Sequence, residues 1–401
     1  MSWFWFWWLI TLLMIVVDVA WWVVALRLTK RRRWRVLVSA FMAAQLAAHL
    51  SASAGIDWPR HVPQSVLVAI MLWHYFALGF GFAVLLPLGI VCGWKWLARR
   101  RARVSGVQRN PPVATLATAN SLSRREFFGA AAALAPPLFT VGLTGVALAQ
   151  LSDFRVRRFT LSILTLPRAL DGITIAQVTD MHVGRLTSSR MLRAMVNTTN
   201  DLRPDLVLLT GDLIDRDLAD LPEAIALVKA MEGRYGQWMI EGNHDLFENG
   251  GEFERRVKAA GVPLLLDESA VAIVRGHPVQ FFGLRWMAGG DAQRDRLTTI
   301  QLGQVLKQRQ PDAFPILLAH HPHAFDAAIK ADLPLTLAGH THGGQLMLDS
   351  QHGVGPAFFR YWSGHYARGN NQLIVSNGVG NWFPLRINAP AEILHITLRC
   401  G

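Results

Sequence analysis

The first part of the chain consists largely of long apolar runs, and these limit it to helices that lie in a membrane or pack tightly on one another. Residues 3–26 form an almost unbroken apolar stretch with tryptophans near both ends. About 20 apolar residues suffice to cross a bilayer, and tryptophan is enriched where such helices meet the interface with water. Three further apolar stretches are residues 36–54, 65–94 and 127–151. The sequence therefore predicts an all-α transmembrane region of about four helices.

Charge is distributed as unevenly as the apolar residues. Up to residue 152 the chain has 15 Lys and Arg against 3 Asp and Glu, whereas the remainder has 25 of each, so the whole formal net charge of +12 lies in the first part. The basic residues form short runs beside the apolar stretches, at residues 30–35 and 99–109. Such runs are typical of the cytoplasmic loops of membrane proteins, not of a basic face that binds nucleic acid. We therefore expect a lipid bilayer, and no nucleic acid, as a partner.

The basic runs also predict a topology. If both are cytoplasmic, the N-terminus is outside and the fourth apolar stretch carries residues 153–401 to the outer, periplasmic side of a bacterial cytoplasmic membrane. The segment at residues 123–128, SRREFF, resembles a twin-arginine export motif, which would make the export machinery a partner; two further positive-inside arginines are the alternative. Ala147-Leu148-Ala149 has the small-x-small form of a cleavage site. Cleavage there and retention of the fourth helix as an anchor both remain open.

Three ionisable residues, Asp18, His49 and His74, lie inside the apolar stretches. Ionisable groups within a membrane are functional candidates, but packing between helices, or extension of the side chain toward water, is the simpler explanation. The sequence assigns them no role.

From residue 153 onward the pattern changes to alternating strands and helices, and five of the predicted strands end in a short polar loop. The loops are TDMH after residues 173–178, TGDLID after 206–209, EGNHD after 237–240, AHHPH after 314–318 and AGHTH after 335–337. In open α/β sheets, ligand sites gather beyond the carboxyl ends of the strands. With only two cysteines in the chain, a metal at this edge would be held by His, Asp and Asn rather than by thiolates.

The polar residues of these loops form a set that is specific as a whole: Asp180, His182, Asp212, Asp215, Asn243, His244, His320, His340 and His342. The set resembles the motifs of the calcineurin-like metallophosphoesterase family over roughly residues 173–342. The resemblance implies a four-layer α/β/β/α sandwich that hydrolyses phosphoesters. The predicted domains are a three-helix transmembrane module at 1–110, a linker with the twin-arginine-like motif and the fourth helix at 111–152, and the catalytic domain at 153–401.

The resemblance implies a role for each member of the set. One metal would be held by Asp180, His182, Asp212 and His342, and a second by Asp212, Asn243, His320 and His340. Two divalent ions can clamp the attacking and leaving oxygens of a displacement at phosphorus, with a hydroxide between them as the nucleophile. Purple acid phosphatases have a tyrosine where this chain has Asp215, so we expect Mn, Zn or Fe without a ferric–tyrosinate centre; ligand type alone does not choose among these metals.

The same resemblance gives His244 and Asp215 a catalytic role instead of a role as metal ligands. In the family, the residue matching His244 faces the substrate and assists the leaving group, and Asp215 would orient its imidazole. His321 and His323 adjoin His320 and either support the ligands or serve as surface or capping residues. Arg386 is predicted either to contact phosphate or to form a surface ion pair.

The sequence therefore favours a membrane-anchored, two-metal phosphodiesterase or pyrophosphatase whose substrate is a lipid-linked or cell-envelope phosphoester. A UDP-diacylglucosamine hydrolase of lipid A synthesis is the alternative, and it would need a site that faces the cytoplasm. A non-catalytic sensor that binds metal or nucleotide is the second alternative. The completeness of the ligand set argues against the sensor.

Overall fold

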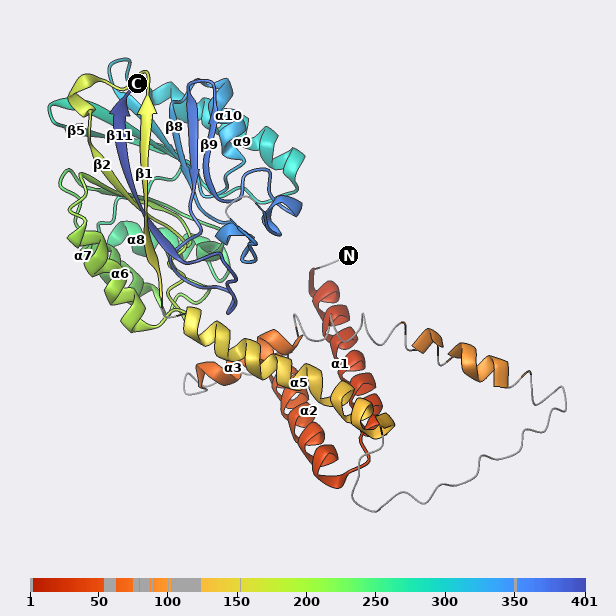
Figure 1. Cartoon of the computed structure of the whole chain (residues 1–401). Helices are drawn as coiled ribbons and strands as arrows, with labels where there is room; N and C mark the ends of the chain where they lie inside the picture. Colours follow the sequence, from red (N-terminus) through yellow and green to blue (C-terminus); the bar gives the residue numbers. More distant parts are fainter. Residues whose placement is uncertain are drawn as a thin grey trace. The chain divides into compact units, whose positions relative to one another are not determined.

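The computed structural model describes residues 3–53, 63–74, 124–151, 153–349 and 352–401, together with single positions and short runs between residues 79 and 101. The chain divides into two compact units, Met1–Leu148 and Ala149–Gly401 (Figure 1). Each unit is described separately below. Most of the predicted linker, including Ser123 of the twin-arginine-like motif, lies outside the described residues.

The first unit consists of helices. Among the described residues, they include α1 (Trp3–Leu28), α2 (Arg32–Ser53), α3 (Gln64–Leu72) and most of α5 (Arg124–Gln150). In the described part of the chain, two segments are long and apolar enough to cross a membrane, Leu9–Leu28 and Glu126–Gln150. Helix α2 covers the second predicted span but is less apolar, because it begins with arginines and contains several polar residues. The third predicted span extends from α3 into residues that are largely outside the described ones.

The three ionisable residues that lie inside the apolar stretches, Asp18, His49 and His74, meet in the first unit. Asp18 is fully buried; its Oδ1 accepts a hydrogen bond of 2.7 Å from Trp73 Nε1, and its Oδ2 lies 3.2 Å from His74 Nε2. The ring of His49 stacks on that of His74 at a centroid distance of 4.4 Å. Asp18 and His74 therefore pair with each other between helices, as buried ionisable groups in apolar surroundings must.

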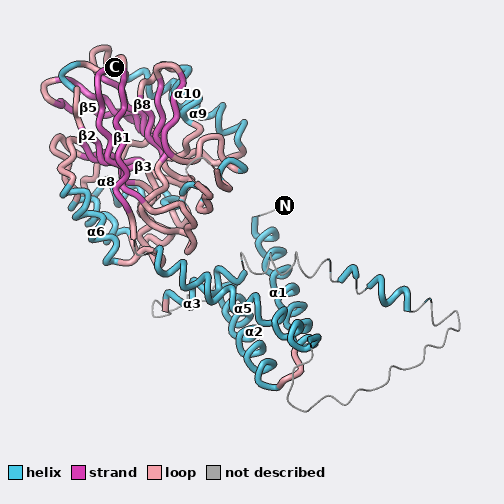
Figure 2. The backbone as a smooth tube through the Cα atoms, viewed as in Figure 1, coloured by secondary structure: helices cyan, strands magenta, loops and turns pink. Residues whose placement is uncertain are grey.

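The second unit contains two mixed sheets (Figure 2). In the first, the strand order is β1 (Arg155–Ile163), β11 (Glu392–Cys400), β2 (Thr174–Val178), β3 (Leu206–Thr210) and β4 (Gln237–Ile240). In the second, it is β5 (Glu268–Val274), β6 (His277–Gly283), β7 (Phe314–Leu318), β8 (Leu335–Ala338), β10 (Asn371–Val375) and β9 (Gly364–Arg368).

Apolar side chains on the facing surfaces of the two sheets form one buried core, to which Ile175, Leu208, Phe281 and Ile316 contribute. The outer face of the first sheet is covered by α6 (Ser189–Asp201), α7 (Leu221–Ala230) and α8 (Gly250–Ala259). The outer face of the second is covered by α9 (Asp291–Val305) and α10 (Ala324–Lys330) (Figure 1). The predicted α/β sandwich is confirmed, and its layers follow the order α/β/β/α.

The direction of the strands decides which loops meet. Strands β2, β3 and β4 are parallel in the first sheet, and β6, β7, β8 and β10 are parallel in the second. Strand β11 is antiparallel to β2 and parallel to β1. The start of β1 therefore lies at the sheet edge where β2 and β3 end, and this edge carries the polar loops.

Candidate metal centre

The polar residues predicted from the sequence converge beyond the ends of β2, β3, β4, β7 and β8. Their side chains include three groups of potential metal ligands: first Asp180, His182 and His342, second Asp212, His320 and His340, and third His182, Asp212 and His244. In each group one ligand atom from every residue lies within 4.8 Å of the others. The first and second groups match the ligand sets that the resemblance assigns to two metals. The differences are that the first group lacks Asp212 and the second lacks Asn243.

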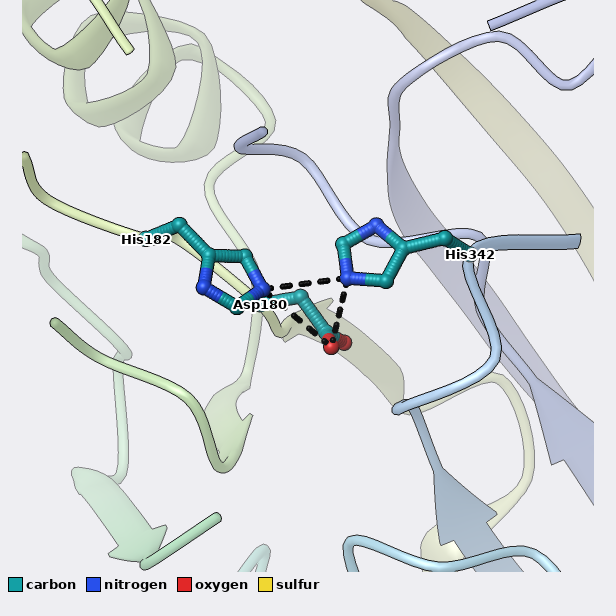
Figure 3. Close-up of side chains that lie close together, drawn as sticks. All are labelled: Asp180, His182 and His342. Atoms are coloured by element: carbon teal, nitrogen blue, oxygen red, sulfur yellow. Dashed lines mark hydrogen bonds and ion pairs between the residues drawn. The ribbon is translucent and has the colours of Figure 1, made fainter. Parts of the chain in front are cut away.

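The ligand atoms of the first group, on Asp180, His182 and His342, lie close together (Figure 3). The Nε2 atoms of His182 and His342 lie 3.0 Å apart, and Asp180 Oδ1 lies 3.1 Å from His342 Nε2 and 3.8 Å from His182 Nε2. The three side chains are fully buried or nearly so. Three buried ligand atoms that face a common point can coordinate a divalent cation.

Asp212 connects this group to the second. Its Oδ2 lies 3.1 Å from His320 Nε2 and 3.7 Å from His182 Nε2. The other ring nitrogen of His320, Nδ1, lies 2.7 Å from the Thr210 carbonyl, and this contact fixes the orientation of the ring. Asn243 Oδ1 is a buried acceptor without a hydrogen-bond donor among the described residues. A buried oxygen without a donor is costly unless a ligand satisfies it, and a metal at this position would do so. The donor set therefore fits two divalent cations.

Burial and neighbouring charges set the ionisation of these side chains. Burial, with His320 nearby, lowers the pKa of His340 to about 3, and burial likewise lowers that of His342 to about 4. Burial opposes ionisation of Asp180 and Asp212, but the adjacent histidines outweigh it and hold both carboxyl pKa values below the ordinary range. At neutral pH Asp180 and Asp212 are therefore carboxylates and His340 and His342 neutral imidazoles, the forms that bind metals. Burial opposes protonation of His320, but Asp212 outweighs it and raises the pKa of His320 to about 9, so a metal there would displace a proton.

The backbone at the centre adopts unusual conformations. Five of the proposed ligands have positive φ, with values of 54° at Asp180, 42° at His182, 53° at Asp212, 72° at His340 and 49° at His342. Residues other than glycine rarely adopt this region, and such strain clusters at functional sites. These turns end the strand geometry of each loop and allow its ligand side chains to converge on the centre.

Glycines beside the ligands allow the loops to approach one another. A Cβ atom on Gly242 would overlap Asp212 Oδ1, and one on Gly339 would overlap Asp180 Oδ2. Only Gly211, which precedes Asp212, also has a positive φ, of 98°. Gly211 therefore serves a sharp turn, whereas Gly242 and Gly339 are needed because a carboxylate occupies the space of a side chain.

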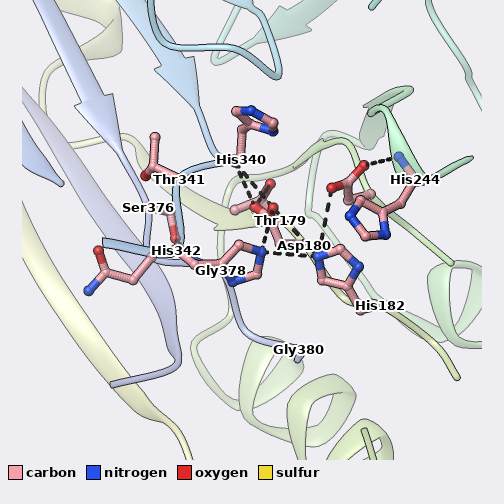
Figure 4. Close-up of polar contacts among 12 residues, drawn as sticks. Thr179, Asp180, His182, His244, His340, Thr341, His342, Ser376, Gly378 and Gly380 are labelled. Atoms are coloured by element: carbon pink, nitrogen blue, oxygen red, sulfur yellow. Dashed lines mark hydrogen bonds and ion pairs between the residues drawn. The ribbon is translucent and has the colours of Figure 1, made fainter. Parts of the chain in front are cut away.

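His244 lies beside the metal ligands, as predicted for a residue that faces substrate (Figure 4). Its backbone N–H donates to Asp212 Oδ1 at 2.8 Å, and its ring lies 4.5 Å from that of His182. Its Nδ1 is 2.7 Å from the backbone carbonyl of Asp215 and 3.4 Å from the carboxylate of the same residue. Burial opposes protonation of His244, but Asp215 and Asp212 outweigh it and raise the pKa of the imidazole. The carbonyl is the nearer partner of the ring, and the carboxylate supplies charge.

Arg386 does not form the surface ion pair that is one of the two sequence expectations. The side chain is buried, with 3% of the residue exposed. Its Nε donates to Asn381 Oδ1 at 2.9 Å, its Nη1 to the Asn377 carbonyl at 2.9 Å and its Nη2 to the Gly380 carbonyl at 2.5 Å. Nη2 also lies 2.8 Å from His342 Nδ1. Arg386 therefore connects the segment 377–381 to a proposed metal ligand and fixes the side of the His342 ring that faces Asp180.

The segment around residue 380 was not recognised in the sequence as part of the site. Val379 N–H donates to the Thr179 carbonyl at 3.0 Å and Gly380 N–H to the Asp180 carbonyl at 2.7 Å. Side chains on Gly378 and Gly380 would overlap Asp180 and Met181 (Figure 4). The two glycines, separated by one residue in Gly378-Val379-Gly380, were the available signal.

Asp245, the last residue of the EGNHD loop, holds two loops of the site in position. It is buried, and its carboxylate accepts from the N–H groups of Leu213 and Gly242 at 2.8 Å and of Ile214 at 3.0 Å. Burial, together with the charge of Asp212, raises its pKa to about 7. Asp245 therefore connects the loop after β4 to the loop after β3.

His321 and His323 support the site indirectly. The ring of His321 lies 5.0 Å from that of His340, and its Nδ1 accepts from His323 N–H at 3.2 Å. His323 Nε2 accepts from Arg360 N–H at 3.1 Å. Both histidines are buried and use ring nitrogens to hold loop backbone, so the surface role is excluded.

Arg386→Leu is expected to destabilise the protein and weaken metal binding. The substitution leaves several buried carbonyls without donors, and breaking a buried charged network typically costs about 3–5 kcal/mol. For a domain of this size, we expect a fall in Tm of about 10 °C, measured on the full chain in detergent with metal-saturated and chelated samples. The matched control is Arg368→Leu on an exposed part of β9. An unchanged Tm for Arg386→Leu would contradict the proposed connection.

Comparison with known proteins identifies the family. The family model for calcineurin-like phosphoesterases matches residues 173–346. An uncharacterized metallophosphoesterase of Bacillus subtilis, YkuE, is 30% identical over 298 residues, which are 69% of this chain and 98% of that protein. The chain therefore belongs to the calcineurin-like phosphoesterase family, which implies a phosphoester hydrolase that uses divalent metals.

Two further relatives extend the comparison in different directions. A transmembrane protein with a metallophosphoesterase domain from Danio rerio is 27% identical over 389 residues, covering 92% of this chain and 81% of that protein. The phosphodiesterase YaeI of Escherichia coli is 25% identical over 205 residues, covering 49% of this chain and 71% of that protein. The first similarity includes much of the helical unit, whereas the second covers about half of the chain.

Proposed function

We propose that this protein is a phosphodiesterase that works with two divalent cations, one held by Asp180, His182, Asp212 and His342 and the other by Asp212, Asn243, His320 and His340. The observation that carries the proposal is the position of Asp212, whose single oxygen Oδ2 is within 4 Å of histidines from both groups. When bound, two such cations polarise a phosphoryl oxygen and lower the pKa of water so that it can attack phosphorus.

The protein's own residues would position and protonate the substrate. His244 is only partly buried and adjoins the centre, so its Nε2 can reach a phosphoester held there. Since Nδ1 faces the carbonyl and carboxylate of Asp215, a protonated ring keeps one N–H on Asp215 and presents the other to the leaving-group oxygen. Donation of that proton to the departing alkoxide is general acid catalysis.

The test is hydrolysis of bis-p-nitrophenyl phosphate by the purified full chain, supplied in parallel with Mn, Zn or Fe(II). We expect turnover that requires metal and is abolished by chelation. A fully metallated protein that hydrolyses neither this diester nor p-nitrophenyl phosphate would reject catalysis and favour a binding role, as in the sensor interpretation.

We further propose that the natural substrate is a phosphoester of a lipid or of the cell envelope, on the outer side of a bacterial cytoplasmic membrane. Two helices with the length and apolarity of membrane spans support this proposal, as does the similarity to proteins named as transmembrane. With alkaline phosphatase fused after Gly401, we expect activity outside the membrane. Fluorescence of a green fluorescent protein fusion at the same position, without phosphatase activity, would instead place the site in the cytoplasm.

A further inference from the structure

Several exposed apolar side chains lie in segments that adjoin the proposed metal centre. Ten large apolar side chains are well exposed among the described residues of 153–401, and six of these lie in three segments at this edge. We call these six the apolar rim: Phe247, Leu348, Val354, Phe358, Trp382 and Ile387. Leu348 is 80% exposed, Phe358 67% and Phe247 50%. Apolar groups concentrated at one place on a surface indicate a binding site.

The apolar rim adjoins the proposed active-site residues. The ring of Phe247 lies 4.4 Å from that of His244, and Trp382 lies 5.9 Å from His244. The segment that carries Leu348, Val354 and Phe358 begins just after His342, and Phe359 at its end lies 5.6 Å from His340. Whatever group extends outward from a phosphate at the centre therefore meets this rim.

Backbone hydrogen bonds hold two of the rim segments together. Met347 N–H donates to the Ile387 carbonyl and Ile387 N–H to the Gln345 carbonyl, both at 2.8 Å. Val354 N–H donates to the Leu346 carbonyl at 2.9 Å. The apolar side chains project from a connected structure, so they cannot easily turn inward to escape water.

The chain enters this unit at the same edge. Four residues separate the end of the apolar helix α5 at Gln150 from the start of β1 at Arg155. Arg155 pairs with Glu392, whose backbone N–H donates to the Gly378 carbonyl beside Asp180. Asn381, which precedes Trp382, donates to the Leu151 carbonyl at 3.4 Å. The chain therefore enters the second unit at the edge that carries the rim, four residues after an apolar helix ends.

We propose that the apolar rim inserts into the surface of a phospholipid bilayer, so that the metal centre acts on phosphoesters embedded in that bilayer. The rim side chains protrude, as groups that enter a lipid interface do, and tryptophan favours that interface. Arg216 is exposed with its Cζ 5.9 Å above the ring of Phe247, where it can meet lipid phosphate. The inference rests on the proposed function, because it assigns the substrate class of the same site.

The first test locates the rim relative to lipid. Full-length protein without its native cysteines (Cys92→Ser, Cys400→Ser) is placed in phosphatidylcholine–phosphatidylglycerol nanodiscs and labelled with bimane at Leu348→Cys or Phe358→Cys. Labels at the equally exposed Leu164→Cys and Ile273→Cys, outside the rim, are the matched controls. We expect doxyl-lipids to quench the rim labels and not the controls. Equal quenching at rim and control positions would overturn the inference.

The second test uses activity. The double variant Leu348→Ser/Phe358→Ser should lose roughly tenfold or more on phosphatidyl-p-nitrophenol in nanodiscs, since two large apolar contacts with lipid are removed. Its hydrolysis of soluble bis-p-nitrophenyl phosphate should remain within about twofold of the parent, which also shows that it is folded. Equal losses on both substrates, or on neither, would contradict the inference and leave the proposed function intact. If the parent hydrolyses neither substrate, the proposed function fails, and the quenching result still decides whether the rim meets lipid.

Discussion

Replacing Asp212 with alanine is expected to remove both metal ions and to abolish hydrolysis. Asp212 lies between the two ligand groups, with Oδ2 3.1 Å from His320 and 3.7 Å from His182. Asp212 belongs to one ligand group with His182 and to another with His320 and His340, and no other carboxylate among the described residues does so. The variant also leaves two adjacent cations without a negative charge between them, so loss of one ion should weaken binding of the other.

Elemental analysis of purified full-length protein measures this effect. We expect about two ions per chain in the parent and far less than one in Asp212→Ala, with a rate at least about 10³-fold lower. Asp217→Ala is the control, because Asp217 is a nearby exposed acid outside both ligand groups. Normal metal occupancy in Asp212→Ala would reject the bridging assignment even if activity fell.

His244→Ala is expected to keep both metals and to lose catalytic rate. The side chain contacts Asp215 and adjoins His182 without belonging to the two proposed ligand sets. Removal of a general acid typically costs about 10²–10⁴-fold. The loss should be large for diesters with poor leaving groups, such as a phenyl ester, and small for p-nitrophenyl esters, whose leaving group departs without a proton.

Asp215→Asn separates orientation of that histidine from its charge. The backbone carbonyl of Asp215, at 2.7 Å, remains in the variant, so the ring should keep its place and the rate should fall by only about tenfold, the equivalent of one hydrogen bond. A loss as large as that of His244→Ala would show that the carboxylate, rather than the carbonyl, controls the imidazole. Depletion of metal in His244→Ala would instead make this residue a ligand.

Much of the site could be predicted from the sequence because the motifs lie at strand ends. His340 and His342 follow a short apolar run, and Asp180 and His182 follow another, so the pattern indicated both the strands and the edge where the side chains meet. A parallel arrangement of such strands brings their carboxyl ends together whatever the length of the helices between them. The candidate ligands therefore needed no knowledge of distances.

The partners of Arg386 and Asp245 could not be predicted in this way. Arg386 is an arginine in a segment without regular structure, and its sequence neighbours do not reveal that it is buried behind His342. Its position depends on the crossing of the segment 377–381 over the loop after β2, a contact between residues about 200 positions apart. The sequence expectation of an ion pair at the surface was wrong because burial depends on the whole fold.

In the helical unit, candidate membrane spans could be predicted from the sequence, but the contacts between helices could not. Apolar length by itself identified residues 3–26 and 127–151 as candidate membrane spans, and helices at both places reach the required length and apolarity. The meeting of Asp18, His49 and His74 in one interior cluster depended on helix packing.

The sequence by itself determined the family, the alternation of strands and helices, and the chemical types of the ligands, because these depend on residue identity and short spacings. Only the tertiary structure decided the positive φ angles that aim the ligands, the buried supports behind them, and the gathering of apolar side chains around the centre. The physical reason is that strain, burial and exposure are properties of contacts between distant segments, and such contacts exist only after the chain has folded.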